Sequence, residues 1–184
     1  MMILITGGSG SGKSAYAEQK VLECGDLNRI YIATMYPFDE ESHKRIKRHR
    51  NMRAEKQFST IECYTGLKTL TIQEHSCVLL ECMSNLTANE MFQEAGAKEH
   101  TVEEILAGIQ VLKEQAEHLI IVTNEIFSDG IEYDRETRTY QEYLGQINRY
   151  LAREADQVIE VVYGIPLHWK KKEGQRHETA MEQF

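Results

Sequence analysis

The sequence predicts an α/β fold in which a mostly parallel central sheet carries helices on both faces, giving three layers. Two observations support this prediction. Short apolar, β-branched runs alternate with longer stretches of helical periodicity, which is the pattern of strand–helix–strand units. Four of the five predicted strands are nearly continuous apolar runs, as expected for strands that are covered on both faces.

Five strands, five helices and one edge strand follow from this pattern. The predicted strands cover Met2–Thr6, Arg29–Thr34, Val78–Cys82, Leu119–Asn124 and Val158–Tyr163, and the predicted helices cover Lys13–Glu23, Glu40–Met52, Asn85–Glu94, Val102–Glu117 and Arg135–Glu154. The segment Gln57–Cys63 alternates apolar and polar residues, which favours an edge strand. The segment Lys170–Phe184 is polar without an apolar period, so we expect a loose tail.

Composition limits the class of protein. The chain has 184 residues, which suits a single domain over residues 1–169 followed by the tail at 170–184. Its net charge of -8 argues against a general nucleic-acid binder, so any anion site must be local. No run approaches the roughly 18 to 20 apolar residues of a membrane span. The short apolar start leaves no room for a secretory signal, so we expect a cytoplasmic protein with reduced thiols.

A glycine-rich loop joins the first predicted strand to the first predicted helix. It matches G-x-x-x-x-G-K-[ST] with Gly7, Gly8, Ser9, Gly10, Ser11, Gly12, Lys13 and Ser14. The glycines let successive N–H groups point into one concavity, and the helix N-terminus adds about half a positive charge facing the same anion. Lys13 would reach the β- and γ-phosphates, and the Ser14 hydroxyl would ligate Mg²⁺. The alternative is a turn that only joins strand to helix; the strand–loop–helix context favours a P-loop NTPase fold.

Polar residues follow two other apolar strands. Glu81 ends one of them and would complete a magnesium site with Ser14, although an acid in this position can also be a simple strand terminus. Thr123, Asn124 and Glu125 end the other, near the carboxyl edge of the sheet where ligands bind in open α/β folds. Capping and turn formation are the alternative role of these three residues.

A basic segment interrupts the otherwise acidic chain. Residues 42–53 read SHKRIKRHRNMR and contain six cations, Lys44, Arg45, Lys47, Arg48, Arg50 and Arg53. At 100° per residue, Ile46, His49 and Arg53 share one helical stripe, so His49 would lie beside the core if Ile46 packs inward. Surrounding positive charge favours neutral imidazole, the form that attacks phosphorus. The spacing alone favours a solvated basic face. An RNA-contacting helix is a further alternative, and His43 is a rival to His49.

Together these residues resemble the bifunctional adenosylcobinamide kinase / adenosylcobinamide-phosphate guanylyltransferase family. The resemblance extends over roughly residues 1–168 in the same order. It is carried by GGSGSGKS at 7–14, YIAT at 31–34, R-I-x-x-H-R at 45–50, LLEC at 79–82 followed by SNL at 84–86, TNE at 123–125, and a late G-x-x-N…A-D-x-V…G-x-P series at 145–166.

The resemblance implies a RecA-like P-loop fold and two reactions of cobalamin biosynthesis. The first would phosphorylate adenosylcobinamide with ATP or GTP. The second would place GMP from GTP on a histidine and pass it to adenosylcobinamide phosphate, giving adenosylcobinamide-GDP. The family's histidine corresponds here to His49, and Lys13 would act beside it in catalysis. The implied nucleotide contacts are Gly7–Ser14, Ala33, Thr34, Met35, Arg50, Asn51, Met52, Arg53, Glu62 and Glu81, and the implied assembly is a homotrimer.

Two other functions stay open at this point. The sequence departs from the family pattern after Glu125. The first alternative is therefore a single-activity P-loop kinase or nucleotidyltransferase that acts on a different acceptor. A P-loop by itself guarantees binding rather than turnover, so a non-catalytic nucleotide-binding regulator is the second alternative.

Overall fold

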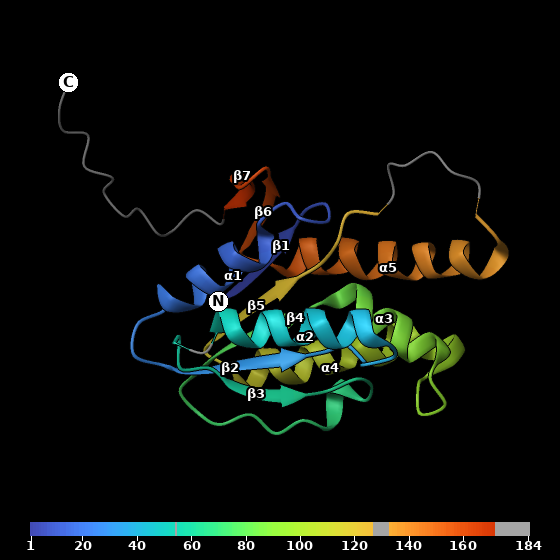
Figure 1. The fold of residues 1–184 in the computed structure, drawn as a ribbon, viewed down its shortest axis with the longest axis horizontal. Helices are drawn as coiled ribbons and strands as arrows, with labels where there is room; N and C mark the ends of the chain where they lie inside the picture. Colours follow the sequence, from blue (N-terminus) through green and yellow to red (C-terminus); the bar gives the residue numbers. More distant parts are fainter. Residues whose placement is uncertain (54, 127–132, 172–184) are drawn as a thin grey trace.

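A seven-stranded sheet forms the centre of the computed structural model, which describes residues 1–53, 55–126 and 133–171 (Figure 1). The strand order is β3-β2-β4-β5-β1-β6-β7. The strands are β1 (Met2–Thr6), β2 (Asn28–Ala33), β3 (Ser59–Glu62), β4 (Ser76–Glu81), β5 (His118–Val122), β6 (Gln157–Val162) and β7 (Ile165–Lys171). All pairings are parallel except that of β6 with β7. The predicted α/β fold is confirmed, and the edge strand predicted near residues 57–63 is β3.

Five α-helices lie within the described ranges, and each corresponds to a predicted helix. They are α1 (Lys13–Leu22), α2 (Glu40–Arg53), α3 (Met83–Phe92), α4 (Thr101–Gln115) and α5 (Arg135–Glu154), together with the short 3₁₀ helices η1 (Leu67–Thr69) and η2 (Lys98–His100). Their ends differ from the predicted ends by no more than two residues. None of the helices that the structure describes is long and apolar enough to cross a membrane.

Strand β1 shows how the three layers form. Successive side chains of a strand point to opposite faces of the sheet. Ile3 and Ile5 accordingly pack in one cluster with Ala17 of α1, while Met2 and Leu4 pack in a second cluster on the other face. Both faces of β1 are therefore buried, which explains why the strand is an unbroken apolar run.

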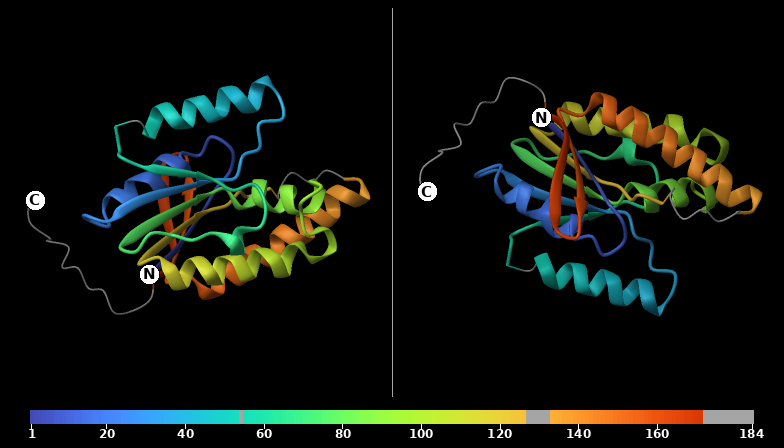
Figure 2. Two further views of the ribbon diagram at one scale, coloured as in Figure 1. Left: turned by 90° about the horizontal axis from the view of Figure 1, so that it is seen from below. Right: turned by 90° about the horizontal axis from the view of Figure 1, so that it is seen from above.

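The second face of the sheet is covered by α3, α4 and α5. Leu86 of α3, Ile109 of α4 and Leu144 of α5 all belong to the cluster that contains Leu4 and Leu80. Helix α1 lies on the opposite face, and α2 lies on the same side as α1 but farther from the sheet (Figure 2). Neither core cluster contains a residue of α2 among those that the structure describes.

Strand β7 is the strand of the sheet that the sequence did not predict. Lys170 and Lys171, assigned to the tail from the sequence, belong to this strand, which runs antiparallel to β6. Tyr163 and Gly164 join the two strands with positive φ angles of 51° and 82°, as a two-residue type I′ hairpin requires. Ile165, Leu167 and Trp169 alternate along the strand but are exposed, and Pro166 stands within the run, which argues against a central strand. The Tyr-Gly pair before Ile165 was the available signal. The rest of the expected tail, residues 172–184, lies outside the described residues.

Helix α4 and η1 approach closely at Gly108. A Cβ at this position would lie 2.7 Å from Leu67 Cβ and 3.0 Å from the backbone nitrogen of Lys68. Alanine is favoured over glycine in a helix by about 1 kcal/mol, but overpacking a core costs about 1–3 kcal/mol. We therefore expect Gly108→Ala to lower the melting temperature, measured by circular dichroism. The exposed Gln110→Ala on the same helix is the control, and a higher melting temperature for Gly108→Ala would show that the contact is not tight.

Candidate active site

The phosphate loop connects β1 to α1 at the carboxyl edge of the sheet. Gly10 and Gly12 adopt left-handed φ angles of 73° and 92°. Gly7 lies against a neighbouring strand, because a Cβ there would come within 2.5 Å of the carbonyl oxygen of Val161. These positions need glycine because a side chain would be strained or would clash. The predicted loop and its location between strand and helix are confirmed.

Two neighbouring segments hold the loop. The backbone N–H of Glu125, after β5, donates to Gly7 O at 3.2 Å. The N–H of Gly164, in the β6–β7 turn, donates to Ser11 O at 2.8 Å. The loop is therefore braced from both sides, so its shape is set by the sheet as well as by its own glycines.

Lys13 lies inside the curve of the loop. Its side chain is 8% exposed, and its Nζ donates to Gly8 O at 3.0 Å. Burial lowers the pKa of Lys13, and the nearby Cys82 and Glu81 oppose that shift. A buried ammonium beside backbone N–H groups is suited to bind a phosphate anion.

Glu81 ends β4 and reaches the start of α1. Its Oε1 accepts a hydrogen bond from the Ser14 hydroxyl, and its Oε2 accepts one from the Tyr31 hydroxyl at 3.1 Å. The structure thus brings Ser14 and Glu81 into contact, whereas their predicted role as Mg²⁺ ligands stays a prediction. Hydroxyl and carboxylate oxygens are the ligands that Mg²⁺ prefers, so this pair fits the ion.

A cleft opens next to Glu81 between the ends of β2, β3 and β4 and the carboxyl half of α2. The residues that line it are Tyr31, Ala33, Met35, Ile46, Arg50, Arg53, Thr60, Glu62, Tyr64, Glu81, Cys82 and Asn85. Six of the predicted nucleotide contacts are among them, namely Ala33, Met35, Arg50, Arg53, Glu62 and Glu81. The structure thus brings together six predicted residues that are up to 48 positions apart in the chain.

Arg53 is the most deeply buried cation of the cleft. It is 6% exposed, and its guanidinium lies 3.4 Å from the centroid of the Tyr31 ring. Its Nε and Nη1 have no hydrogen-bond partner among the atoms of the described residues. Buried donors without partners are costly, so Arg53 is suited to an anionic ligand.

A more exposed set of contacts lies at the mouth of the cleft. Arg50 forms an ion pair with Glu62, whose other carboxylate oxygen accepts a hydrogen bond from Tyr64 at 2.8 Å. Burial, together with this hydrogen bond, raises the pKa of Tyr64 to about 12. Since both partners of the ion pair are about half exposed, it contributes little to stability. Its role is better understood as orienting Arg50.

Two predicted nucleotide contacts, Thr34 and Asn51, do not line the cleft. The Thr34 hydroxyl is buried, donates to Cys82 O at 2.8 Å and accepts from Cys82 N at 2.7 Å. Asn51 is exposed and is not among the residues that line the cleft. The Met52 side chain lies outside the described residues. Direct nucleotide contact by these residues stays a prediction.

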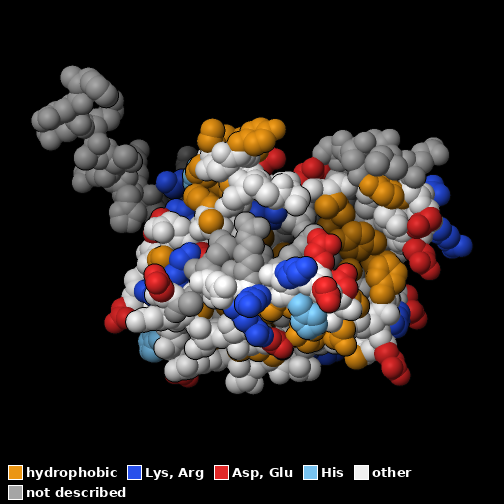
Figure 3. All heavy atoms as spheres, viewed as in Figure 1, with side chains coloured by type: hydrophobic (Ala, Val, Ile, Leu, Met, Phe, Trp, Pro, Cys, Tyr) orange, Lys and Arg blue, Asp and Glu red, His pale blue; other side chains and the backbone are white. Residues whose placement is uncertain are grey.

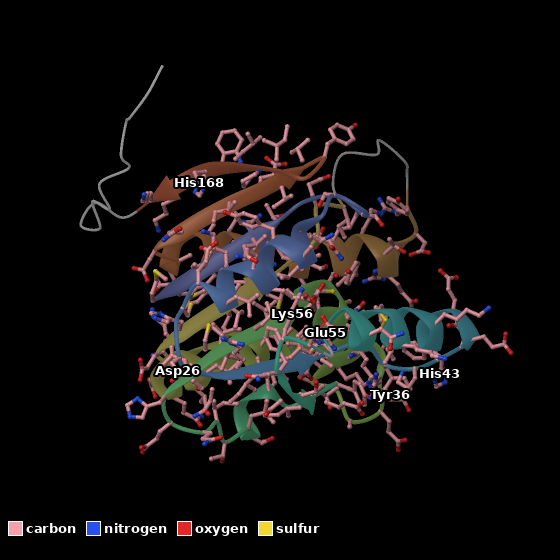
Figure 4. The ribbon with its side chains drawn as sticks, turned by 60° about the vertical axis from the view of Figure 1, so that its left-hand side comes forward. Asp26, Tyr36, His43, Glu55, Lys56 and His168 are labelled. Atoms are coloured by element: carbon pink, nitrogen blue, oxygen red, sulfur yellow. The ribbon has the colours of Figure 1, made fainter. Side chains whose placement is uncertain are left out.

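Helix α2 carries the basic segment and His49. Ile46 and Arg53, predicted to share a helical stripe with His49, both line the cleft. The backbone of His49 lies in α2, whereas its side chain is outside the part of the chain that the structure describes. His43 is exposed and lies near the start of α2 (Figure 4). Figure 3 shows Lys and Arg side chains, with acidic groups close by, where α2 crosses the front of the molecule.

The TNE segment lies at the carboxyl end of β5, as predicted. Thr123 Oγ1 donates to Asn148 Oδ1 at 2.8 Å, and Asn124 Nδ2 donates to Ser84 Oγ at 2.6 Å. These bonds tie the end of β5 to α5 and α3. Thr123 and Asn124 therefore position the edge of the site.

Sequence reasoning missed several residues of the cleft. Tyr31 and Thr60 lie within predicted strands, and no contact with a ligand was predicted for either of them. Tyr64, Cys82 and Asn85 follow the ends of β3 and β4. Their position just after parallel strands was the signal that would have placed them at the ligand-binding edge.

Residues 3–169 match the family model described as "Cobinamide kinase / cobinamide phosphate guanyltransferase". The chain belongs to this family. It is accordingly an enzyme of a bifunctional kinase and guanylyltransferase family, and its phosphate loop makes it a nucleotide-binding protein.

Two curated members of this family are similar to this chain over most of their length. "Bifunctional adenosylcobalamin biosynthesis protein CobU" from Escherichia coli (strain K12) is 34% identical over 180 residues, which cover 90% of this chain and 97% of that protein. The protein of the same name from Salmonella typhimurium is 33% identical, with the same coverage. Among solved structures, the flagellar accessory protein FlaH from Methanocaldococcus jannaschii has a TM-score of 0.50 at 13% identity, and the match covers 92% of this chain and 78% of that one. The last similarity supports the fold alone.

Two adjacent glycines of the loop offer a matched test of its shape. Gly7→Ala should weaken binding of a fluorescent GTP analogue about tenfold or more, because its Cβ would meet the backbone oxygen of Val161. Gly8→Ala should lose less affinity than Gly7→Ala, since no protein atom lies within 4 Å of a Cβ at that position. Equal affinities of the two variants, measured by fluorescence titration, would contradict the importance of this close approach.

Proposed function

We propose that this enzyme catalyses two reactions on one acceptor. The first transfers the γ-phosphoryl group of ATP or GTP to the hydroxyl of adenosylcobinamide. The second transfers GMP from GTP to adenosylcobinamide phosphate through His49, giving adenosylcobinamide-GDP. The observation that carries this proposal is the junction of a complete phosphate loop with an arginine-lined cleft formed partly by the helix that contains His49.

In the kinase step, the acceptor hydroxyl oxygen attacks the γ-phosphorus. The bond from that phosphorus to the β–γ bridging oxygen breaks, the nucleoside diphosphate leaves, and the hydroxyl proton passes to solvent. Lys13 and the loop N–H groups stabilise the charge on the phosphates. Ser14 and Glu81 are the residues that would hold Mg²⁺, which supplies neutralisation of phosphate charge when bound.

In the transfer step, an imidazole nitrogen of His49 attacks the α-phosphorus of GTP. The α–β phosphoanhydride bond breaks and pyrophosphate leaves. An oxygen of the acceptor phosphate then attacks the same phosphorus, the N–P bond breaks, and His49 is restored. Arg50 and Arg53 lie about one turn or less from His49 along α2, and both line the cleft, so they are placed to stabilise negative charge on the transferred group.

We also propose that the protein is a cytoplasmic homotrimer built from one domain. The β6–β7 hairpin supports assembly, because it exposes four large apolar side chains: Tyr163, Ile165, Leu167 and Trp169. Figure 3 shows apolar side chains gathered over this end of the molecule. Exposed apolar patches of this kind mark protein contacts. The sheet itself includes β7, so the domain extends through Lys171.

Labelling with GTP tests the transfer step. Wild-type protein incubated with GTP labelled in the α-phosphate should retain label in an acid-labile adduct, because N–P bonds hydrolyse in acid. His49→Ala should retain none, and the control variant His43→Ala should label normally. Equal labelling of His49→Ala and wild type would remove His49 from the mechanism.

The two steps should also be separable in His49→Ala. This variant should still phosphorylate adenosylcobinamide with γ-labelled ATP or GTP, since hydroxyl attack does not involve the imidazole. A wild-type enzyme that phosphorylates another alcohol but not adenosylcobinamide would support the single-activity alternative. Nucleotide binding without transfer or adduct would support a regulator.

Light scattering after gel filtration tests the assembly. We expect wild-type protein at three times the chain mass of 21.3 kDa. Ile165→Lys should shift the protein to a smaller species, because it places a charge in the exposed apolar patch. Phe92→Ser, which changes an exposed aromatic residue outside the hairpin, is the control. A monomeric wild-type protein would contradict the proposal.

A further inference from the structure

Tyr31 lies in the middle of β2, where two functional side chains meet it from different directions. It is 4% exposed and forms an edge-to-face contact with Phe58, with ring centroids 6.3 Å apart. Its hydroxyl contacts Glu81, and its ring face contacts Arg53. One buried side chain therefore touches both the carboxylate beside the phosphate loop and the buried cation of the cleft.

The hydroxyl of Tyr31 restrains the Glu81 carboxylate. It donates to Oε2 at 3.1 Å, while the Ser14 hydroxyl donates to Oε1. With both oxygens held, the plane of the carboxylate is fixed relative to the phosphate loop. A bound cation would meet a carboxylate that is already oriented, which lowers the cost of binding.

The ring of Tyr31 restrains Arg53 in a different way. The guanidinium lies over the ring face at 3.4 Å, so it is held by stacking and cation–π attraction. This contact consumes no N–H group. Nε and Nη1 of Arg53 accordingly remain without partners within the described residues, although the side chain is 6% exposed. Tyr31 thus fixes the guanidinium and leaves its donors available to an anion.

We propose that Tyr31 is a positioning residue of the nucleotide site, whose hydroxyl orients Glu81 toward the cation and whose ring presents Arg53 to the nucleotide anion. This inference rests on the proposed function, because it takes the cleft and the phosphate loop as one nucleotide site. Tyr31 would link the Glu81 carboxylate beside the phosphate loop to Arg53 of α2. Since the two contacts use different parts of the side chain, substitutions can separate them.

Binding of guanosine α,β-methylene triphosphate tests the proposal without turnover, because its α–β bridge cannot be cleaved. Affinity is measured by calorimetry in EDTA and in Mg²⁺, and Mn²⁺ bound to the complex is measured by electron paramagnetic resonance. Tyr31→Phe should bind the metal-free nucleotide within about twofold of wild type. Its gain in affinity on adding Mg²⁺ should fall about tenfold, as expected for the loss of one hydrogen bond to a charged group, and Mn²⁺ binding should weaken in parallel.

Tyr31→Leu and Arg53→Ala complete the comparison. Tyr31→Leu should show the same reduced gain in affinity on adding Mg²⁺ as Tyr31→Phe. It should also bind the metal-free nucleotide about tenfold more weakly than wild type, because it removes the stacking surface for Arg53 as well. Arg53→Ala should bind the nucleotide more weakly in EDTA, but its affinity should still rise on adding Mg²⁺ by the same factor as that of wild type. Tyr140→Phe, which removes a buried hydroxyl bonded to Ser84 O, is the control and should change neither.

The outcomes separate this inference from the proposed function. If Tyr31→Phe gains as much nucleotide affinity on adding Mg²⁺ as wild type and binds Mn²⁺ equally well, the role of the hydroxyl would be overturned. A Tyr31→Leu protein with wild-type metal-free affinity would overturn the role of the ring. A His49→Ala protein that labels normally would leave both roles standing, because these readouts need no transfer. Wild-type protein that fails to bind the analogue would overturn the inference and the proposed function together.

Discussion

The in-register parallel pairing of β2, β4, β5 and β1 is the constraint on which the site depends. Ala33 lies opposite Glu81, Glu81 opposite Val122, and Val122 opposite Ile5. The four strands therefore end at the same level, and the residues that follow them meet along one edge. A shift of one residue would turn every side chain to the other face. The buried apolar faces of the strands fix the register and, through it, the geometry of the loop and cleft.

The charge of the site is local and partly uncompensated. In a chain of net charge -8, Lys13 and Arg53 are buried at this edge. Lys13 donates one hydrogen bond to a carbonyl of its own loop, whereas two donors of Arg53 have no partner in the described structure. Burying such donors costs stability. A site organised in this way is completed by a phosphate-bearing ligand, and the stacking on Tyr31 explains how the guanidinium stays in place.

Features with local signatures could be predicted from the sequence. The phosphate loop is an eight-residue motif between a strand and a helix, and the buried strands are continuous apolar runs. Strand β7 has a weaker signature, because only three alternating apolar residues, Ile165, Leu167 and Trp169, mark it and Pro166 interrupts the run. The role of Tyr31 depends on Glu81, which is 50 positions away. No local pattern conveys such a contact, and only the strand order brings the two residues together.

The central claim is that the imidazole of His49 becomes the temporary carrier of GMP from GTP bound in the phosphate loop. A crystal structure of the enzyme with GTP or its α,β-methylene analogue tests this claim most directly, through the distance from the ring nitrogens of His49 to the α-phosphorus. The account predicts a separation of about 3–3.5 Å, the range of a near-attack geometry. A ring that faces solvent, far from the phosphates in every ligand state, would contradict it.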